Sequence, residues 1–196
     1  MKLHYSAASP FVRKVSAVAL HHGLALERVD TNPHASPPHL LVDNPLSKVP
    51  TLVLDNGMML PDSPLICEYL DSIGTAAKLY PAAGAPRWEA LRLAALAEGI
   101  LTAAVLRRGL SLQPAEEARD AMMERQKAAI SRTLDQLERE PLPGALNIGV
   151  IGLVCALGYL DFRFGEDDWR ARHPGLAAFF AARSENPIFA RTVPQG

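Results

Sequence analysis

The chain of 196 residues is long enough to form one compact domain or two small ones, and its composition does not choose between them. Its 48% hydrophobic and 21% charged residues, with a formal net charge of -1, are typical of an ordinary globular protein. Such a charge lacks the basic surplus that polyanion binding requires, so nucleic acid is not an expected partner.

The two cysteines, Cys67 and Cys155, each lie in an apolar stretch, where free buried thiols are commoner than disulfides or metal ligands. We therefore expect a reducing, cytoplasmic compartment. Polar residues His4 and Ser6 come too early for the apolar core of a secretion signal. The most apolar run, residues 148–160, is shorter than a membrane-spanning helix and contains glycines, so we expect it to be buried in the protein and predict no membrane association.

The first part of the chain changes from a period of two to a helical period. Residues 1–5 alternate apolar and polar side chains, which predicts a strand with one buried face. From Pro10 the apolar residues recur at helical spacing as far as Gly23, and Ser9 is the expected cap of this helix. A second strand is predicted over residues 24–30.

The next part contains the clearest local signal in the sequence. After a loop with a short helix at residues 37–45, two apolar runs within residues 49–62 flank Asn56-Gly57, which predicts a β-hairpin. Ser63, followed by proline, is then expected to cap a helix that ends at Gly74.

We predict a first domain at residues 1–75, with elements in the order β-α-β-α-β-β-α, and a linker rich in Ala, Gly and Pro at residues 76–86. Beyond it the strand signals stop, so residues 87–196 are expected to form an all-helical domain. Its helices are predicted at residues 87–110, 114–140, 148–162 and 174–183.

Several stretches of the sequence resemble the cytosolic glutathione S-transferases. They are SPFVRKVSAVALHHGL, NPLSKVPTLVLDNGMMLPDSPLICEYLD, ALGYLDFR and HPGLAAFFAARSENPIFARTVP. The chain is most similar to a bacterial serine-type branch, and SPFVRKV and DSPLICEYL also resemble the tau class and, with Cys in place of Ser9, the omega class. The resemblance implies a thioredoxin-like α/β first domain and an all-α second domain.

The resemblance also gives Ser9 a possible role in chemistry. In glutaredoxins, which share the thioredoxin-like fold, Cys-Pro-Tyr-Cys stands where this chain has Ser9-Pro10-Phe11-Val12. A serine hydroxyl is too weak an acid for thiol–disulfide exchange. The resemblance implies instead that Ser9 donates a hydrogen bond to the sulfur of bound glutathione and so stabilises the thiolate.

The energies make this role reasonable. Lowering a thiol pKa of about 8.5 by ~2 units requires roughly 2.7 kcal/mol, which one charge-assisted hydrogen bond and a helix N-terminus can supply. Helix capping is the alternative role of Ser9. Ser6 is the second candidate for the sulfur contact, and Tyr5 is the third.

The other implied glutathione contacts lie around the hairpin. Val49 precedes Pro50 at the family's cis-proline and would pair its main chain with the cysteinyl part of glutathione. Asp62 and Ser63 would bind the γ-glutamyl end, because a helix N-terminus suits a carboxylate and Asp62 can meet an ammonium group. Without the resemblance, Pro50 would be interpreted as a strand start, and ordinary helix capping would be the preferred explanation of Asp62 and Ser63.

The glycyl end of glutathione has weaker candidate residues. Lys48 and, with less support, His39 are expected near the glycyl carboxylate.

The second substrate is expected between the two domains. Its candidate lining residues are Phe11, Glu98, Leu101, Thr102, Val105 and Arg108. Such a stripe on a helix is also typical of core or dimer contacts.

The resemblance therefore implies a glutathione transferase, homodimeric as in the family, that conjugates glutathione, a co-substrate, to a small hydrophobic electrophile in detoxification, with no prosthetic group. The alternatives are a glutathione- or ligand-binding stress-related protein with little catalysis, and a regulatory protein that uses its surface. The sequence has no Gly-x-Ser-x-Gly elbow, phosphate loop or metal-ligand spacing. His21 and His22 are expected at a solvated helix end, so no metal is predicted.

Overall fold

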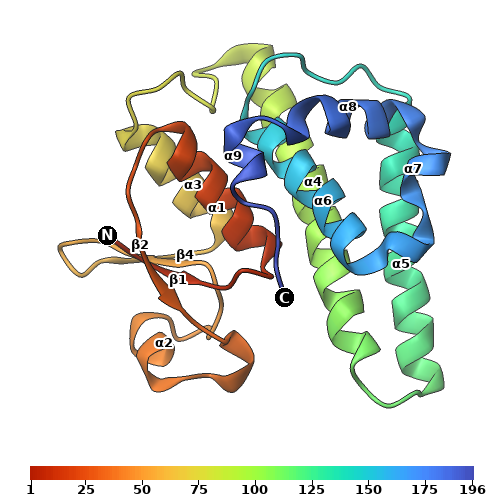
Figure 1. Ribbon diagram of the computed structural model, residues 1–196, viewed down its shortest axis with the longest axis horizontal. Helices are drawn as coiled ribbons and strands as arrows, with labels where there is room; N and C mark the ends of the chain where they lie inside the picture. Colours follow the sequence, from red (N-terminus) through yellow and green to blue (C-terminus); the bar gives the residue numbers. More distant parts are fainter. The chain divides into compact units, whose positions relative to one another are not determined.

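The computed structural model describes residues 1–196 and divides into two compact units (Figure 1). The first unit contains Met1–Ala82 together with Pro187–Gly196, and the second contains Ala83–Asn186. This differs from the predicted division at residues 75 and 87. The last ten residues belong with the first unit, because Ile188 and Phe189 bury their side chains and contact its first helix.

The first unit is built on a four-stranded mixed sheet in the order β2-β1-β3-β4. Strand β1 (Lys2–Tyr5) pairs parallel to β2 (Glu27–Asp30) and antiparallel to β3 (Thr51–Val53), which pairs antiparallel to β4 (Met59–Pro61). The predicted hairpin is confirmed: Gly57 has φ +85°, a conformation that glycine adopts without strain.

Helices cover both faces of this sheet. Figure 1 shows α1 (Pro10–His21) and α3 (Ser63–Ile73) on one face and the short α2 (Pro38–Asp43) on the other. The apolar face of α1 includes Val15 and Val18, which are fully buried, as the helical spacing predicted. The sequence analysis missed a 3₁₀ turn at Pro33–Ala35 and the helix α9 (Pro187–Ala190).

The second unit is entirely helical, as predicted. Its helices are α4 (Gly84–Ser111), α5 (Glu117–Glu138), α6 (Ile148–Phe164), α7 (Trp169–Arg172) and α8 (Pro174–Ser184), with a 3₁₀ turn, η2 (Gly165–Asp167). Helix α6 packs closely on α4, since a Cβ added at Gly149 would lie 2.7 Å from the Ala90 carbonyl oxygen. Glycine is therefore required at this crossing.

Helix α6 is the central helix of this unit. Every residue from Ile148 to Leu160 is buried. The stretch Ile148–Asp167, which extends beyond the apolar run at residues 148–160, is long and apolar enough to cross a membrane by length and composition alone. However, 72% of its most apolar window is buried inside the protein, which confirms the expected core helix.

Candidate functional site

Three separate segments of the first unit meet at one edge of its sheet. His4 of β1 pairs with Thr51 of β3, and Thr51 pairs with Pro61 of β4. Strand β1 ends at this edge, β3 begins there and β4 ends there, so the segments that follow or precede them lie together. We call the predicted glutathione-binding residues on these segments the edge site: Ser9, Val49, Asp62 and Ser63.

Ser9 caps helix α1. Its Oγ accepts a hydrogen bond from the Val12 N–H at 3.3 Å, and its carbonyl accepts one from the Arg13 N–H at 3.0 Å. A serine hydroxyl has one donor and two acceptor positions, and capping uses only an acceptor. The hydroxyl proton of Ser9 has no acceptor in the structure, so capping leaves Ser9 able to donate to a ligand.

The loop before β3 is held by Asn44, which sequence reasoning missed. Asn44 is 1% exposed, and its Nδ2 donates to the Lys48 carbonyl at 3.2 Å and to Thr51 Oγ1 at 2.8 Å. The Thr51 hydroxyl also donates to the Lys48 carbonyl, at 2.7 Å. The Asn-Pro step at this position was the available signal, because it favours a turn in which the asparagine side chain bonds nearby backbone.

This buried asparagine fixes the chain just before Val49. The Val49–Pro50 peptide bond is cis, and Val49 lies beyond the first ladder pair of β3, which begins at Thr51. The Lys48 side chain is exposed, although its carbonyl is held. The edge of the sheet next to Val49 is therefore fixed in position.

Asp62, and not Ser63, caps helix α3, so the predicted cap was wrong by one residue. The Asp62 carboxylate accepts from the Ser63 N–H at 2.8 Å, while Asp62 itself has φ +70°. Ser63 is fully buried, and its Oγ has no hydrogen-bond partner. A positive φ outside glycine costs about 1–3 kcal/mol, and a buried unpaired hydroxyl costs a similar amount. Two unfavourable features thus stand side by side.

His39 lies in a different cluster, on the α2 side of the sheet. Its ring stacks on that of His4 with centroids 5.6 Å apart, and its Nε2 is 3.4 Å from Thr31 Oγ1. His4 in turn contacts Asp43 of α2 at 2.7 Å. His4, His39 and Asp43 border a cavity of about 180 Å³, which Lys2 also lines. The structure therefore gives His39 intramolecular partners and groups it with α2.

Comparison with known proteins decides the family. Residues 3–76 match the glutathione S-transferase N-terminal domain, and residues 116–182 match the glutathione S-transferase C-terminal domain. An Escherichia coli K12 protein described as the uncharacterized GST-like protein YibF is 34% identical over 199 residues, covering 99% of this chain and 98% of that protein. The chain belongs to the glutathione S-transferase family. The family and fold expected from the sequence are confirmed.

Other members of the family extend this result. A crystal structure of a glutathione transferase family member from Pseudomonas fluorescens Pf-5, with bound glutathione, is 40% identical with a TM-score of 0.92. That similarity covers 100% of this chain and 99% of the other. Glutathione S-transferase U3 of Arabidopsis thaliana is 30% identical over 155 residues, covering 79% of this chain and 68% of that protein.

The second-substrate candidates of this glutathione S-transferase family member are divided between its units. Phe11 lies on α1 and is partly buried, whereas the other five lie on α4. Leu101 is fully buried and Thr102 is exposed. The remaining three are partly exposed: Glu98, Val105 and Arg108. Their grouping into one pocket stays a prediction.

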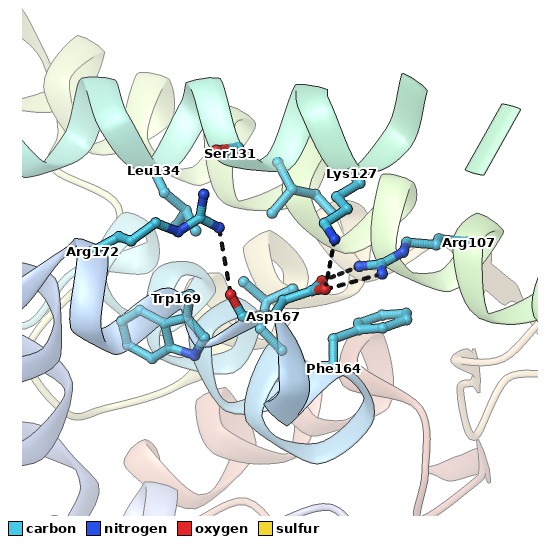
Figure 2. Close-up of a pocket in the computed structure, with 10 residues that line it drawn as sticks. Arg107, Lys127, Ser131, Leu134, Phe164, Asp167, Trp169 and Arg172 are labelled. Carbon is cyan, nitrogen blue, oxygen red and sulfur yellow. Dashed lines mark hydrogen bonds and ion pairs between the residues drawn. The ribbon is translucent and has the colours of Figure 1, made fainter. Parts of the chain in front are cut away.

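A second polar cluster, in the helical unit, surrounds Asp167 (Figure 2). Its carboxylate accepts two hydrogen bonds from Arg107 and pairs with Lys127 at 3.1 Å, and its carbonyl lies 3.5 Å from Arg172 Nη2. Burial raises the pKa of Asp167, but the hydrogen bonds and charges of Arg107 and Lys127 outweigh it and lower that pKa overall. The adjoining cavity, about 20 Å³, holds roughly one water. The cluster joins α4, α5 and η2 and is structural.

His22 corrects another expectation, because it is buried and not solvated. Its Nε2 lies 2.9 Å from an Asp71 carboxylate oxygen, and the same oxygen accepts from the Leu79 N–H at 2.7 Å. A Cβ added at Gly74 would lie 2.2 Å from the His22 ring, so this ring occupies the space that glycine leaves. No group of three or more potential metal-ligating side chains occurs in the structure.

Proposed function

We propose that this protein binds glutathione at the edge site and catalyses attack of the glutathione thiolate on a small hydrophobic electrophile. The observation that carries the proposal is Ser63, a fully buried hydroxyl without a partner at the start of a helix. It adjoins Asp62 and lies at the same sheet edge as Ser9. The glutathione bound in the Pseudomonas fluorescens relative, at 40% identity, supports this choice of ligand.

The γ-glutamyl end of glutathione matches the chemistry around Ser63. Its carboxylate would accept from the Ser63 hydroxyl, near the positive end of the α3 dipole, once a small movement of the exposed Asp62 turn makes that buried hydroxyl accessible. Its ammonium group would meet the exposed Asp62 carboxylate, which accepts only the Ser63 N–H. Binding would thus offset the cost of the unpaired hydroxyl and of the Asp62 backbone conformation.

The rest of the peptide would follow the sheet edge toward Lys48. The Val49 main chain would pair with the cysteinyl part of glutathione, as one added strand does. The exposed Lys48 ammonium would attract the glycyl carboxylate. His39 is the weaker candidate for that end because its Nε2 lies within hydrogen-bond distance of Thr31 and its ring stacks on His4.

Ser9 would stabilise the sulfur as a thiolate. Its Oγ is oriented by the Val12 N–H and retains its proton for donation. A hydrogen bond to a charged group is worth ~1.5–3 kcal/mol, and the α1 N-terminus adds ~0.3–2 kcal/mol. The thiol proton passes to solvent. The sulfur lone pair then forms the C–S bond, while the displaced electron pair leaves with the electrophile's leaving group or is protonated by water.

The proposal includes three further predictions from the sequence. The electrophile would contact Phe11 and the α4 candidates, the protein would act as a homodimer, and it would reside in the cytoplasm. Glutathione would serve as a co-substrate, with no prosthetic group.

The test is to replace Ser9 with alanine and to compare it with Ser6→Ala. With glutathione and a chlorodinitrobenzene as substrates, Ser9→Ala should lower kcat about 10–100-fold. The Kd for glutathione should stay within about threefold, because the γ-glutamyl contacts remain. Undiminished turnover in Ser9→Ala would overturn the assignment, and a loss confined to Ser6→Ala would transfer the role to Ser6.

A second candidate function uses the same site. The features around Ser63 support glutathione binding and do not themselves require turnover. If wild-type protein binds glutathione but conjugates none of a panel of electrophiles, the protein is a glutathione-binding member of the family with little catalysis.

A further inference from the structure

The segment Pro187–Gly196, which we call the return segment, comes back to the helix that begins at Ser9. It follows the whole helical unit in sequence, yet it belongs to the first compact unit. Its helix α9 contacts α1, and Figure 1 shows the C-terminal mark beside the start of α1. The established family membership assigns no role to these contacts.

One contact lies four residues after Ser9. Arg13 is 6% exposed, and its Nη2 donates to the Phe189 carbonyl of α9 at 3.4 Å. Its Nε and Nη1 are buried without a partner, so the Phe189 carbonyl is the one acceptor that this guanidinium has. The Arg13 N–H donates to the Ser9 carbonyl at 3.0 Å, so Arg13 connects α9 to the first turn of α1, which Ser9 caps.

The other contact lies two residues before Ser9. The Gln195 N–H donates to the Ala7 carbonyl at 3.2 Å. Within the same turn, the Ser9 N–H donates to the Ser6 carbonyl at 3.0 Å. Of these bonds, the one from Gln195 is the bond that ties the exposed Ala7 to a residue outside the turn. Both sides of Ser9 are braced by residues that lie more than 170 positions away in the sequence.

We propose that the return segment positions the Ser9 hydroxyl, with Gln195 acting as a positioning residue through Ala7. This inference rests on the proposed function, in which Ser9 contacts the glutathione sulfur. The position of the Ser9 Oγ depends on the Ser9 backbone, which is held by the bonds to Ser6 and Arg13, and on the Val12 N–H from which Oγ accepts. A shift of about 1 Å in a catalytic group can cost on the order of 100-fold in rate, so a weakened brace affects catalysis before it affects folding.

The test compares Gln195→Pro with Gln195→Ala. Both substitutions remove the exposed side chain, but only proline removes the N–H that Ala7 accepts. We expect kcat to be about tenfold lower in Gln195→Pro than in Gln195→Ala, with similar glutathione KM values. The pH profile of kcat/KM and the ultraviolet absorbance of bound thiolate should both move to higher pH by about one unit in the proline variant. A merely structural role would lower the melting temperature without moving the pH profile.

Hydrogen exchange of the amides of residues 6–12 tests the brace without glutathione. Exchange should be faster in Gln195→Pro than in Gln195→Ala. Equal exchange and equal pH profiles in the two variants would overturn the inference. Wild-type protein that forms no glutathione thiolate would instead contradict the proposed function, whatever the exchange rates, so the two failures are distinguishable.

Discussion

The carboxylates at the two ends of helix α3 differ in how many hydrogen bonds they accept. At the C-terminal end, Asp71 accepts from His22 at 2.9 Å and from the Leu79 N–H at 2.7 Å, and Lys78 donates to the Gly74 carbonyl at 2.8 Å. At the N-terminal end, Asp62 accepts one N–H and has a positive φ. Beside it the Ser63 hydroxyl is buried without a partner.

We interpret this difference as one between a structural polar group and a group that would bind the proposed ligand. Native proteins satisfy nearly all buried polar atoms, so an exception needs an explanation. Other buried atoms of the first unit also lack a partner, including Ser16 Oγ and His22 Nδ1. Those two lie within α1 or at its C-terminal end, away from the sheet edge where three segments meet. The proposed binding site therefore rests on an unpaired group combined with that convergence, and not on the unpaired group alone.

The largest effect on stability is expected at the C-terminal end of α3, where the carboxylate accepts several hydrogen bonds. Asp71→Ala leaves His22 and the Leu79 N–H unpaired in the interior, which should cost about 3 kcal/mol of unfolding free energy. The melting temperature should fall by roughly 6–12 °C for a chain of this size. Thermal and urea unfolding measure the change. Glutathione affinity of the folded protein should be unaffected.

The control for Asp71 is Ser72→Ala, an exposed neighbour on the same turn. Its cost should stay within about 0.5 kcal/mol. If Asp71→Ala is no less stable than this control, the hydrogen bonds of Asp71 do not stabilise the protein. The proposed difference between the two ends of α3 would then be contradicted.

Ser63→Ala should show the reverse pattern. Glutathione Kd should rise about tenfold, since a hydrogen bond to the γ-glutamyl carboxylate is lost. Unfolding free energy without glutathione should be unchanged or up to ~1 kcal/mol higher, because the substitution removes an unsatisfied hydroxyl. Calorimetric titration and thermal unfolding measure the two quantities.

Ser16→Ala is the matched control for Ser63. It also removes a buried hydroxyl without a partner, but in the interior of α1. Its stability should respond as that of Ser63→Ala does, while glutathione affinity stays the same. A Ser63→Ala variant that loses stability and keeps its affinity would make Ser63 a structural residue.

Asp62→Gly should raise stability and weaken binding by about 1 kcal/mol each. Glycine adopts the φ of +70° without strain, and glycine is only a few tenths of a kcal/mol poorer as a cap. Asp62→Asn separates the causes, since asparagine keeps the cap and tolerates a positive φ but has no charge. Equal glutathione Kd values for Asp62→Asn and wild type would exclude the contact with the ammonium group.

Local patterns in the sequence were sufficient for most of the fold. The Asn56-Gly57 turn and the switch from strand to helix periodicity depend on neighbouring residues, and both predictions are confirmed. The cap of α3 was misassigned by one residue because Asp62 and Ser63 are both good caps, and only the backbone shows which has helical dihedral angles.

The remaining features depend on contacts between residues far apart in the chain. The residues near His22 in the sequence do not indicate that His22 will be buried beside Asp71. Those near Phe189 do not indicate that its carbonyl will accept a hydrogen bond from Arg13. The contacts of His39 with His4 and Thr31 likewise join residues that are not adjacent in the sequence. Such long-range pairings are outside the reach of periodicity and capping rules.

The smallest expected effect extends the comparison to the helical unit, where Asp167 is another satisfied carboxylate. Its folded pKa lies below the unfolded value of about 3.9. Its stabilising contribution is therefore present above that value and is lost as pH falls through the folded pKa. Asp167→Asn should lower the unfolding free energy by ~1 kcal/mol at pH 7, and the difference from wild type should shrink progressively below about pH 4. Urea unfolding from pH 7 to pH 2 measures this, with the exposed Glu166→Gln as control. If the wild type and Asp167→Asn differ by the same amount at every pH, the Arg107 and Lys127 contacts do not act through the charge of Asp167.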